Sequence, residues 1–158
     1  MKFFVKNKFG SLGGSSKVYD ENGTNLFKVK GKVFSFTRKK KIFDMDGKLL
    51  FVVKNKFINW WAHTSFIFDG EKQKIASVKN RAFKGGYDVV GYTDEIALDG
   101  WGLKGYTVLK NGEKVGSVKS NIMALTDTYE VEVDDEQDIA FMVAIIVAMD
   151  NVNDKSKR

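Results

Sequence analysis

The sequence of 158 residues contains no cysteine, no proline and a single histidine. Without cysteine the chain can form no disulfide, no thiolate metal site and no cysteine nucleophile. Proline has no backbone N–H, so its absence fits a chain of paired strands in which every N–H group is needed. The segment WWAHTSF around His63 shows no pattern of catalytic or metal-ligating companions, so we interpret His63 as a structural residue.

The chain also lacks a long hydrophobic run, and we expect no secretory leader. Its longest apolar run, Ile139 to Met149, has eleven residues. As a helix this run is about 16 Å long, against about 30 Å for the hydrocarbon core of a bilayer. The opening residues MKFFVKNKFGS carry lysines where a signal peptide needs its apolar segment. We therefore expect an intracellular, cytoplasmic protein.

Composition predicts one folded domain. The hydrophobic content of 43% and the aromatic content of 13% argue against disorder, and the chain is long enough to bury a sizeable core. The net charge is +6, from 26 basic and 20 acidic residues. This balance indicates solubility and a mild attraction to anionic surfaces, rather than a dedicated nucleic-acid-binding protein.

The apolar run near the C-terminus is predicted to be a helix enclosed by the rest of the protein. It is polar on no face, so protein must surround it. Asp138 precedes it and can cap its first turn, while Lys155 and Lys157 follow it at the end where cations are favoured. The alternative is an ordinary helix lying between two layers.

The body of the chain, up to about residue 133, is predicted to be a series of β-hairpins. A phrase of Asp or Asn, Gly, an apolar pair and Val-Lys recurs, as in DENGTNLFKVKGK and DMDGKLLFVVKNK. The recurring phrase contains four dipeptides that are typical of two-residue type I′ turns: Asn22-Gly23, Asp46-Gly47, Asp69-Gly70 and Asn111-Gly112. Ten to twelve strands follow, and the run TYEVEV would place Tyr129, Val131 and Val133 on one face. The simplest arrangement is a closed antiparallel barrel with the helix inside it.

Several motifs that resemble catalytic or ligand sites have the wrong context. Residues 100–105 satisfy GxGxxG, but a strand pattern follows instead of a helix, so we predict a connection between strands. The aspartates at Asp20 and Asp44 open no calcium loop, because position twelve is Gly31 or Asn55 instead of Glu. GxSxG, HExxH and P-loop motifs are absent. We expect no enzymatic activity, no metal and no cofactor.

One surface feature suggests a function, because basic and aromatic residues occur together. The candidate residues for binding an anionic headgroup are Arg38, Lys39, Lys40, Lys41, Lys54, Lys56, Trp60 and Trp61. Lysine and arginine attract anionic lipid, and tryptophan favours the membrane interface. A third basic group contains Lys79, Arg81 and Lys84. The alternatives are a solvated lysine-rich surface with both indoles packed inside, and a platform for single-stranded nucleic acid.

Nearly the whole chain, from about residue 3 to 152, resembles the LURP-one-related proteins. The resemblance is carried by LFKVKGK, LLFVVKNK, WGLKGYTVLKNGEKVGSVKS and TYEVEV, and most specifically by the terminal pattern D-x-A-F-x-x-A-I-I-V-A-x-D. These proteins belong to the tubby C-terminal-like superfamily, with the phospholipid scramblases. The resemblance implies a closed barrel of about twelve strands around a central C-terminal helix. Residues 1–153 would form this single tubby-like domain, and residues 154–158 a short basic tail.

The resemblance also bears on function, because tubby domains bind phosphoinositides through a basic pocket and scramblases act at membranes. No tubby lipid-binding motif matches this chain residue by residue, so the candidate residues above rest on charge alone. We expect a non-enzymatic module that binds an anionic membrane surface or phosphoinositide-like headgroup, peripherally and without a transmembrane span. The alternatives are a protein-interaction or structural scaffold, with a partner that the sequence does not identify, and an enzyme or small-ligand carrier.

Overall fold

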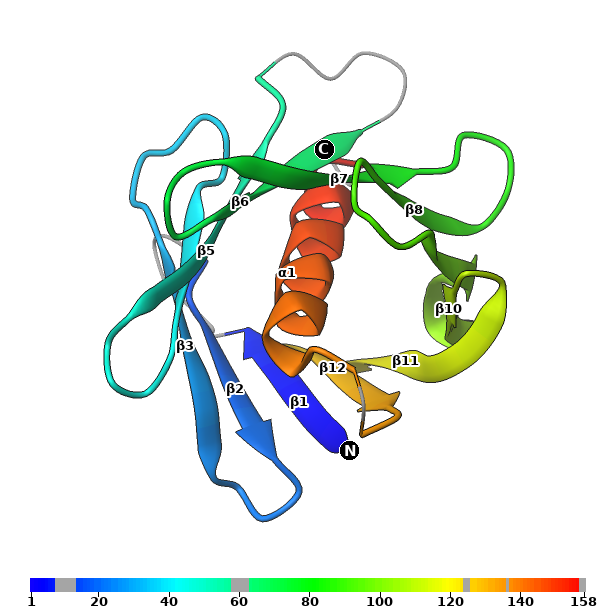
Figure 1. Cartoon of the computed structure of the whole chain (residues 1–158), viewed down its shortest axis with the longest axis horizontal. Helices are drawn as coiled ribbons and strands as arrows, with labels where there is room; N and C mark the ends of the chain where they lie inside the picture. The colour runs from blue at the N-terminus through cyan, green and yellow to red at the C-terminus, as the bar shows by residue number, and fades with distance from the viewer. Residues whose placement is uncertain (8–13, 58–62, 124–125, 136, 157–158) are drawn as a thin grey trace.

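The computed structural model of the whole chain describes residues 1–7, 14–57, 63–123, 126–135 and 137–156. Within these residues, twelve antiparallel strands close into a barrel around one helix, as predicted (Figure 1). Each strand pairs with its neighbours in sequence, and β1 closes the barrel against β12. The strands are β1 (Lys2–Asn7), β2 (Ser16–Asp20), β3 (Asn25–Gly31), β4 (Lys40–Phe43), β5 (Leu49–Asn55), β6 (Thr64–Asp69), β7 (Lys74–Asn80), β8 (Gly86–Val90), β9 (Ile96–Trp101), β10 (Gly105–Lys110), β11 (Glu113–Met123) and β12 (Thr126–Val133).

Alternation along each strand determines which side chains line the barrel. Tyr129, Val131 and Val133 all point inward and are buried, which confirms the single face predicted for TYEVEV. The same period gives every strand an inward-facing apolar set that belongs to one core with the helix. Fully buried members include Phe3, Val18, Ile42, Val53, Ile67, Val78, Leu98, Val108 and Val118. The core therefore lies inside the barrel, between the sheet and the helix.

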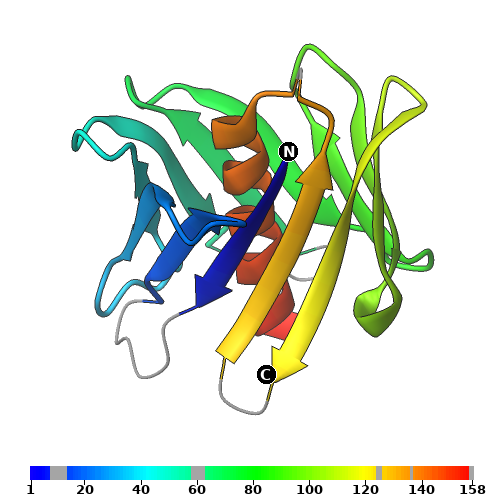
Figure 2. The same cartoon turned by 90° about the horizontal axis from the view of Figure 1, so that it is seen from below.

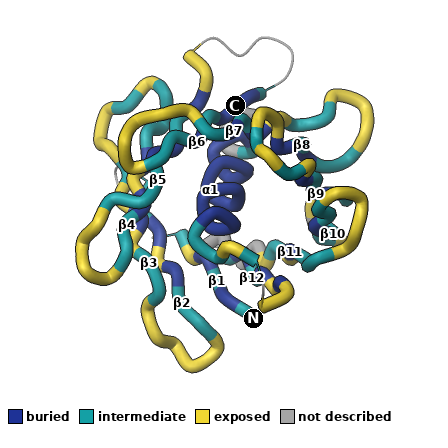
Figure 3. Tube along the Cα trace, viewed as in Figure 1, coloured by how far each residue is buried: buried dark blue, intermediate teal, exposed yellow. Residues whose placement is uncertain are grey.

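The helix α1 (Ile139–Ser156) occupies the interior of the barrel. Asp138 caps it: its carboxylate accepts the backbone N–H of Phe141 at 3.0 Å, and its carbonyl that of Met142. Every residue from 141 to 152 is buried, and Figure 3 shows α1 as one dark core surrounded by exposed loops. The enclosed helix is thus confirmed, but it runs on to Ser156. The domain boundary predicted after residue 153 therefore falls within α1.

Three of the four hairpin turns differ from the prediction. In the turns that begin at Asp20, Asp44 and Asp69, the aspartate carboxylate accepts backbone N–H bonds of 2.8–3.0 Å from residues two and four positions later. A register shift precedes each turn, so these are longer loops with a bulge rather than two-residue turns. Only Asn111-Gly112 joins its strands as a two-residue turn with positive φ at both positions. The aspartates act as turn residues, as predicted.

The two ends of the barrel carry different connections. Asn7, at the end of β1, donates a side-chain hydrogen bond to Asp150 of α1, so β1 and α1 finish at the same end. Because strands alternate in direction, β3, β5, β7, β9 and β11 finish there too. Figure 2 shows α1 running along the barrel beside β1 and β12. We call this the α1 C-terminal end. The glycine-rich residues 100–105 lie there, with the short helix η1 (Gly102–Lys104) between β9 and β10, as predicted.

Candidate functional site

The outer surface of β3, β4 and β5, with the β3–β4 connection, carries a group of lysines that we call the lysine face: Lys28, Lys30, Lys41 and Lys54 on the strands, and Lys32 and Lys39 in the connection. Alternation directs the four strand lysines outward, because their strand neighbours Val29, Ile42 and Val53 point into the core. Residues 25–43 and 49–57 contain no Asp or Glu. Within the described residues, none of the six lysines forms an ion pair. The face is therefore a concentration of positive charge without an acidic counterpart.

Strand register brings several lysines directly opposite one another. Lys30 on β3 faces Lys41 on β4, and the row continues on the neighbouring strands with Lys28 opposite Lys17 and Lys17 opposite Lys6. Like charges in cross-strand pairs destabilise a sheet by a few tenths of a kcal/mol to about 1 kcal/mol each. The fold therefore holds these charges together at a cost to its own stability.

The electrostatics of Lys39 reflect this crowding. Partial burial lowers the pKa of Lys39 below its ordinary value of 10.5, and the positive charges of Lys41, Lys32, Lys54 and Lys72 lower this pKa further. An anion bound beside Lys39 would relieve the repulsion among these cations. The lysine face is thus suited to an anionic ligand.

Aromatic rings support some of these lysines. The Nζ atom of Lys54 lies 4.8 Å from the centre of the Phe68 ring, and that of Lys30 lies 5.6 Å from the Phe43 ring. Both distances allow a cation–π contact. At the edge of the lysine face, β2 and β3 line a groove of about 440 Å³ that includes Lys17 together with Lys28 and Lys30 of the face. The groove provides a concave basic surface large enough for a headgroup.

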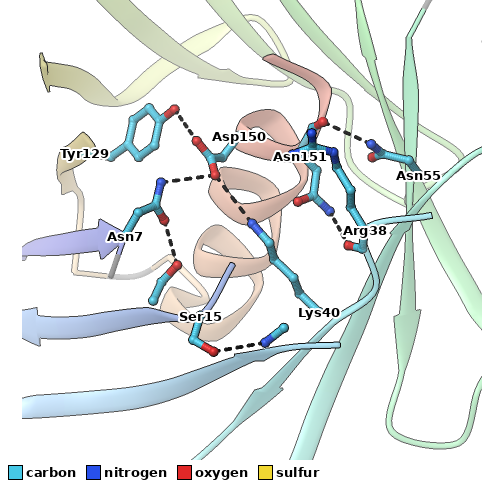
Figure 4. A network of polar contacts seen from close by, with 10 residues as sticks. Asn7, Ser15, Arg38, Lys40, Asn55, Tyr129, Asp150 and Asn151 are labelled. Atoms are coloured by element: carbon cyan, nitrogen blue, oxygen red, sulfur yellow. Dashed lines mark hydrogen bonds and ion pairs between the residues drawn. The ribbon is translucent and has the colours of Figure 1, made fainter. Parts of the chain in front are cut away.

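The structure corrects the grouping of Lys40 with Lys39 and Lys41. Lys40 shares the inward face of β4 with Ile42, is 5% exposed, and forms an ion pair of 3.5 Å with Asp150 of α1. Asp150 also accepts hydrogen bonds from Tyr129 at 2.7 Å and from Asn7 at 3.2 Å (Figure 4). Lys40 is therefore part of the buried polar layer around the end of α1, and it offers no charge to a ligand on the outer surface.

The other candidate residues divide between several places. Arg38 lies in the β3–β4 connection, where its carbonyl oxygen accepts a hydrogen bond from the Asn151 side chain. Lys56 is exposed just beyond β5. Trp60 and Trp61 lie outside the described residues. In the third basic group, Arg81 forms ion pairs with Asp88 and Asp99. Its charge is therefore balanced by acidic residues, unlike the charges of the lysine face.

Sequence reasoning missed the contribution of β3 to this site. Lys28, Lys30 and Lys32 alternate with apolar or glycine positions in LFKVKGK, and this period-two pattern could have placed them on one outer face.

Within the described residues, no helix combines the length and hydropathy needed to cross a membrane. The same residues contain no group of three or more histidine and acidic side chains placed to hold a metal ion.

The fold defines the class of this protein: an up-and-down antiparallel barrel of twelve strands built around a C-terminal helix. The chain belongs to the LURP-one-related family, whose family model matches residues 1–150. The X-ray structure of a protein from Arabidopsis thaliana is similar in fold, with a TM-score of 0.69 and 21% sequence identity over 96% of this chain and 91% of that one. No curated protein matches the sequence. The resemblance to this family is thereby confirmed.

Proposed function

We propose that this protein is a non-enzymatic binding module that docks on anionic membrane headgroups through its lysine face. The carrying observation is the set of like-charged cross-strand neighbours, above all Lys30 opposite Lys41. A sheet that only needed stability and solubility would gain from pairing these lysines with acidic residues. Instead the charges accumulate on one surface, where each lysine near an anionic bilayer contributes about 1 kcal/mol of attraction.

The chemistry of the face suits phosphate groups. Lysine ammonium groups bind phosphate as point charges, and their long side chains can follow a mobile lipid surface. The groove lined by β2 and β3 adds concavity, so a phosphoinositide headgroup could be held by Lys17, Lys28 and Lys30. The proposed place of the protein is cytoplasmic and peripheral to the membrane.

Vesicle flotation tests this function. Phosphatidylcholine vesicles, with or without phosphatidylserine or a phosphoinositide, are compared at low and high salt. Binding is expected only with anionic lipid, and high salt should weaken it because the attraction is screened. Lys30→Gln/Lys41→Gln should lower the affinity by roughly 30-fold, given about 1 kcal/mol for each lysine.

Lys114→Gln/Lys119→Gln is the matched control, because it removes the same charge from exposed positions on β11. An equal loss in the control would show that net charge acts and not the lysine face. Absence of binding at low salt would overturn the proposal and leave the barrel as a scaffold for a protein partner. At equal surface charge, a preference for phosphoinositide over phosphatidylserine would assign the headgroup to the groove.

A further inference from the structure

Exposed aromatic side chains gather at one end of the barrel. Within the described residues, Phe34 is 95% exposed, Phe36 is 87% exposed and Phe57 is 70% exposed, and all three lie in connections at the α1 C-terminal end. Phe83 and Trp101 are exposed at the same end. The large apolar residues exposed at the opposite end, Met1, Met45 and Val90, are none of them aromatic. Large aromatic side chains in water are unfavourable, so this concentration indicates a surface that is covered in use.

The charges of the two ends are opposite. Within the described residues, the connections at the α1 C-terminal end, residues 14–15, 32–39, 56–57, 63, 81–85 and 102–104, contain seven lysines and arginines and no acidic residue. One of the seven, Arg81, is paired with Asp88 and Asp99 of the adjoining strands. The described connections at the other end, residues 21–24, 44–48, 70–73, 91–95, 111–112, 134–135 and 137–138, contain nine acidic residues and two basic residues. An anionic surface would therefore attract the aromatic end and repel the other, which orients the barrel before contact.

The β3–β4 connection, residues 32–39, presents its phenylalanines on a fixed backbone. The N–H of Lys32 bonds the carbonyl of Lys39 at 2.9 Å, which closes the loop at its base, and the N–H of Asn55 bonds the carbonyl of Thr37 at 2.7 Å. Phe34 has a φ of 57°, a left-handed conformation that is rare for a bulky residue. Residues held in such conformations cluster at binding sites, because the surrounding structure must enforce them.

We propose that the β3–β4 connection is a membrane anchor: Phe34 and Phe36 insert into the interface of an anionic bilayer, and the α1 C-terminal end faces the lipid. This inference rests on the proposed function and adds to it the inserted residues and the orientation. Lys32 and Lys39 flank the two phenylalanines in sequence and belong to the lysine face, so insertion would bring both ammonium groups to headgroup depth. An anionic membrane surface has phosphates above apolar chains. The lysines would meet the phosphates, and the aromatic rings between them would reach the apolar chains.

Site-specific fluorescence tests insertion directly. The wild-type chain has no cysteine, so Val33→Cys and Met45→Cys each accept one environment-sensitive dye at positions of similar exposure, 42% and 44%, on opposite ends of the barrel. Vesicles of equal parts phosphatidylcholine and phosphatidylserine should shift the emission of the dye at position 33 to the blue. The dye at position 45 should keep its emission in water.

Phe34→Ser/Phe36→Ser measures the contribution of the rings to binding. Each phenylalanine that leaves water should strengthen binding about tenfold. The variant is therefore expected to bind the same vesicles roughly 100-fold more weakly, with the salt dependence of the wild type. Met45→Ser/Val90→Ser is the control at the opposite end and should bind as the wild type does. Far-ultraviolet circular dichroism checks that all variants are folded.

The outcomes separate the anchor from the proposed function. Salt-dependent binding of the wild type, with no blue shift at position 33 and no loss in Phe34→Ser/Phe36→Ser, would overturn the anchor and leave the headgroup function standing. Absence of binding to anionic vesicles would overturn both. Light scattering could also show a wild-type dimer that Phe34→Ser/Phe36→Ser converts to a monomer. The phenylalanines would then pack against a second copy of the chain, and the anchor would also be overturned.

Discussion

The side chain of Asn151, on the buried helix, donates a hydrogen bond of 3.0 Å to the backbone carbonyl oxygen of Arg38 in the β3–β4 connection. The backbone of Asn151 is held in turn by the amide of Asn55, which donates to its carbonyl oxygen at 3.0 Å. These contacts join the core helix to the connection that carries Phe34 and Phe36. The position of the exposed loop is therefore set by residues inside the barrel, at the end of α1.

Asn151→Ala should loosen this connection without unfolding the barrel. It removes the hydrogen bond that Asn151 donates to the part-buried carbonyl of Arg38, which costs about 0.5–1.5 kcal/mol. Hydrogen exchange should become faster at the backbone amides of Arg38 and Lys39, which bond to Ser35. Asn25→Ala, at an exposed position at the start of β3, is the control. Unchanged exchange at both amides would show that the loop holds itself without the helix.

The ion pair between Lys40 and Asp150 predicts a strong coupling between two residues far apart in sequence. Asp150→Asn leaves the ammonium group of Lys40 buried without a carboxylate, and breaking such a pair costs about 3–5 kcal/mol. Lys40→Met leaves the charge of Asp150 without its cation, although the bonds from Tyr129 and Asn7 remain. The double variant Lys40→Met/Asp150→Asn should recover much of the loss, because neither charge remains buried.

Urea denaturation of the two single variants and the double variant measures this coupling as a double-mutant cycle. Additive losses would mean that the ion pair does not form. Vesicle binding gives a second comparison. The folded double variant should bind anionic vesicles as the wild type does, since Lys40 lies inside the barrel and makes no contact with the outer surface.

The charge of Lys39 is expected to lower the stability of the fold and to strengthen binding to anionic vesicles. Because its pKa in the folded protein lies below 10.5, the folded state holds this proton less tightly than the unfolded chain does. The charged form therefore destabilises the fold at neutral pH, and the penalty disappears as the pH rises through the folded pKa toward 10.5. Lys39→Met should be more stable than the wild type at neutral pH, with a gain that vanishes above 10.5, yet bind anionic vesicles more weakly.

Urea denaturation from neutral pH to above 10.5 measures how the stability difference between Lys39→Met and the wild type depends on pH. Lys119→Met is the control, because Lys119 faces the acidic Glu130 across β11 and β12 and should show no such gain. A stability change in Lys39→Met that is unfavourable and independent of pH would contradict the crowding of charge on the lysine face.

The barrel and its central helix could be predicted because both depend on patterns within short windows. An apolar run of eleven residues has to be enclosed, and alternation in runs such as TYEVEV fixes the buried face of each strand. The turns were harder, because an Asp-Gly pair does not show whether a bulge precedes it. At Asp69 the left-handed residue is Lys72 and not Gly70, so the glycine of the pair does not mark the position that needs it.

The candidate site could be predicted only in part, for reasons of register. Four consecutive cations, Arg38 to Lys41, look alike in composition, but in a strand alternate residues point to opposite faces. Lys40 shares the parity of Ile42 and turns inward, where its partner Asp150 lies 110 residues away in sequence. The phenylalanines of the β3–β4 connection carry no sequence pattern that distinguishes an exposed ring from a buried one. Their exposure depends on the path of the closed loop.

Ile145→Asp tests the enclosure on which the whole architecture depends. Ile145 is fully buried on α1, between residues that are also buried on every side of the helix. A carboxylate there would lie within the apolar core. Burying it unpaired costs several kcal/mol, and the lost packing of isoleucine adds to this cost, against a stability of about 5–15 kcal/mol for a domain of this kind. Soluble expression and circular dichroism should show no folded protein, while Met45→Asp, at an exposed turn position, should fold normally. A folded, soluble Ile145→Asp would mean that water reaches this face of α1, and that the helix does not fill the barrel.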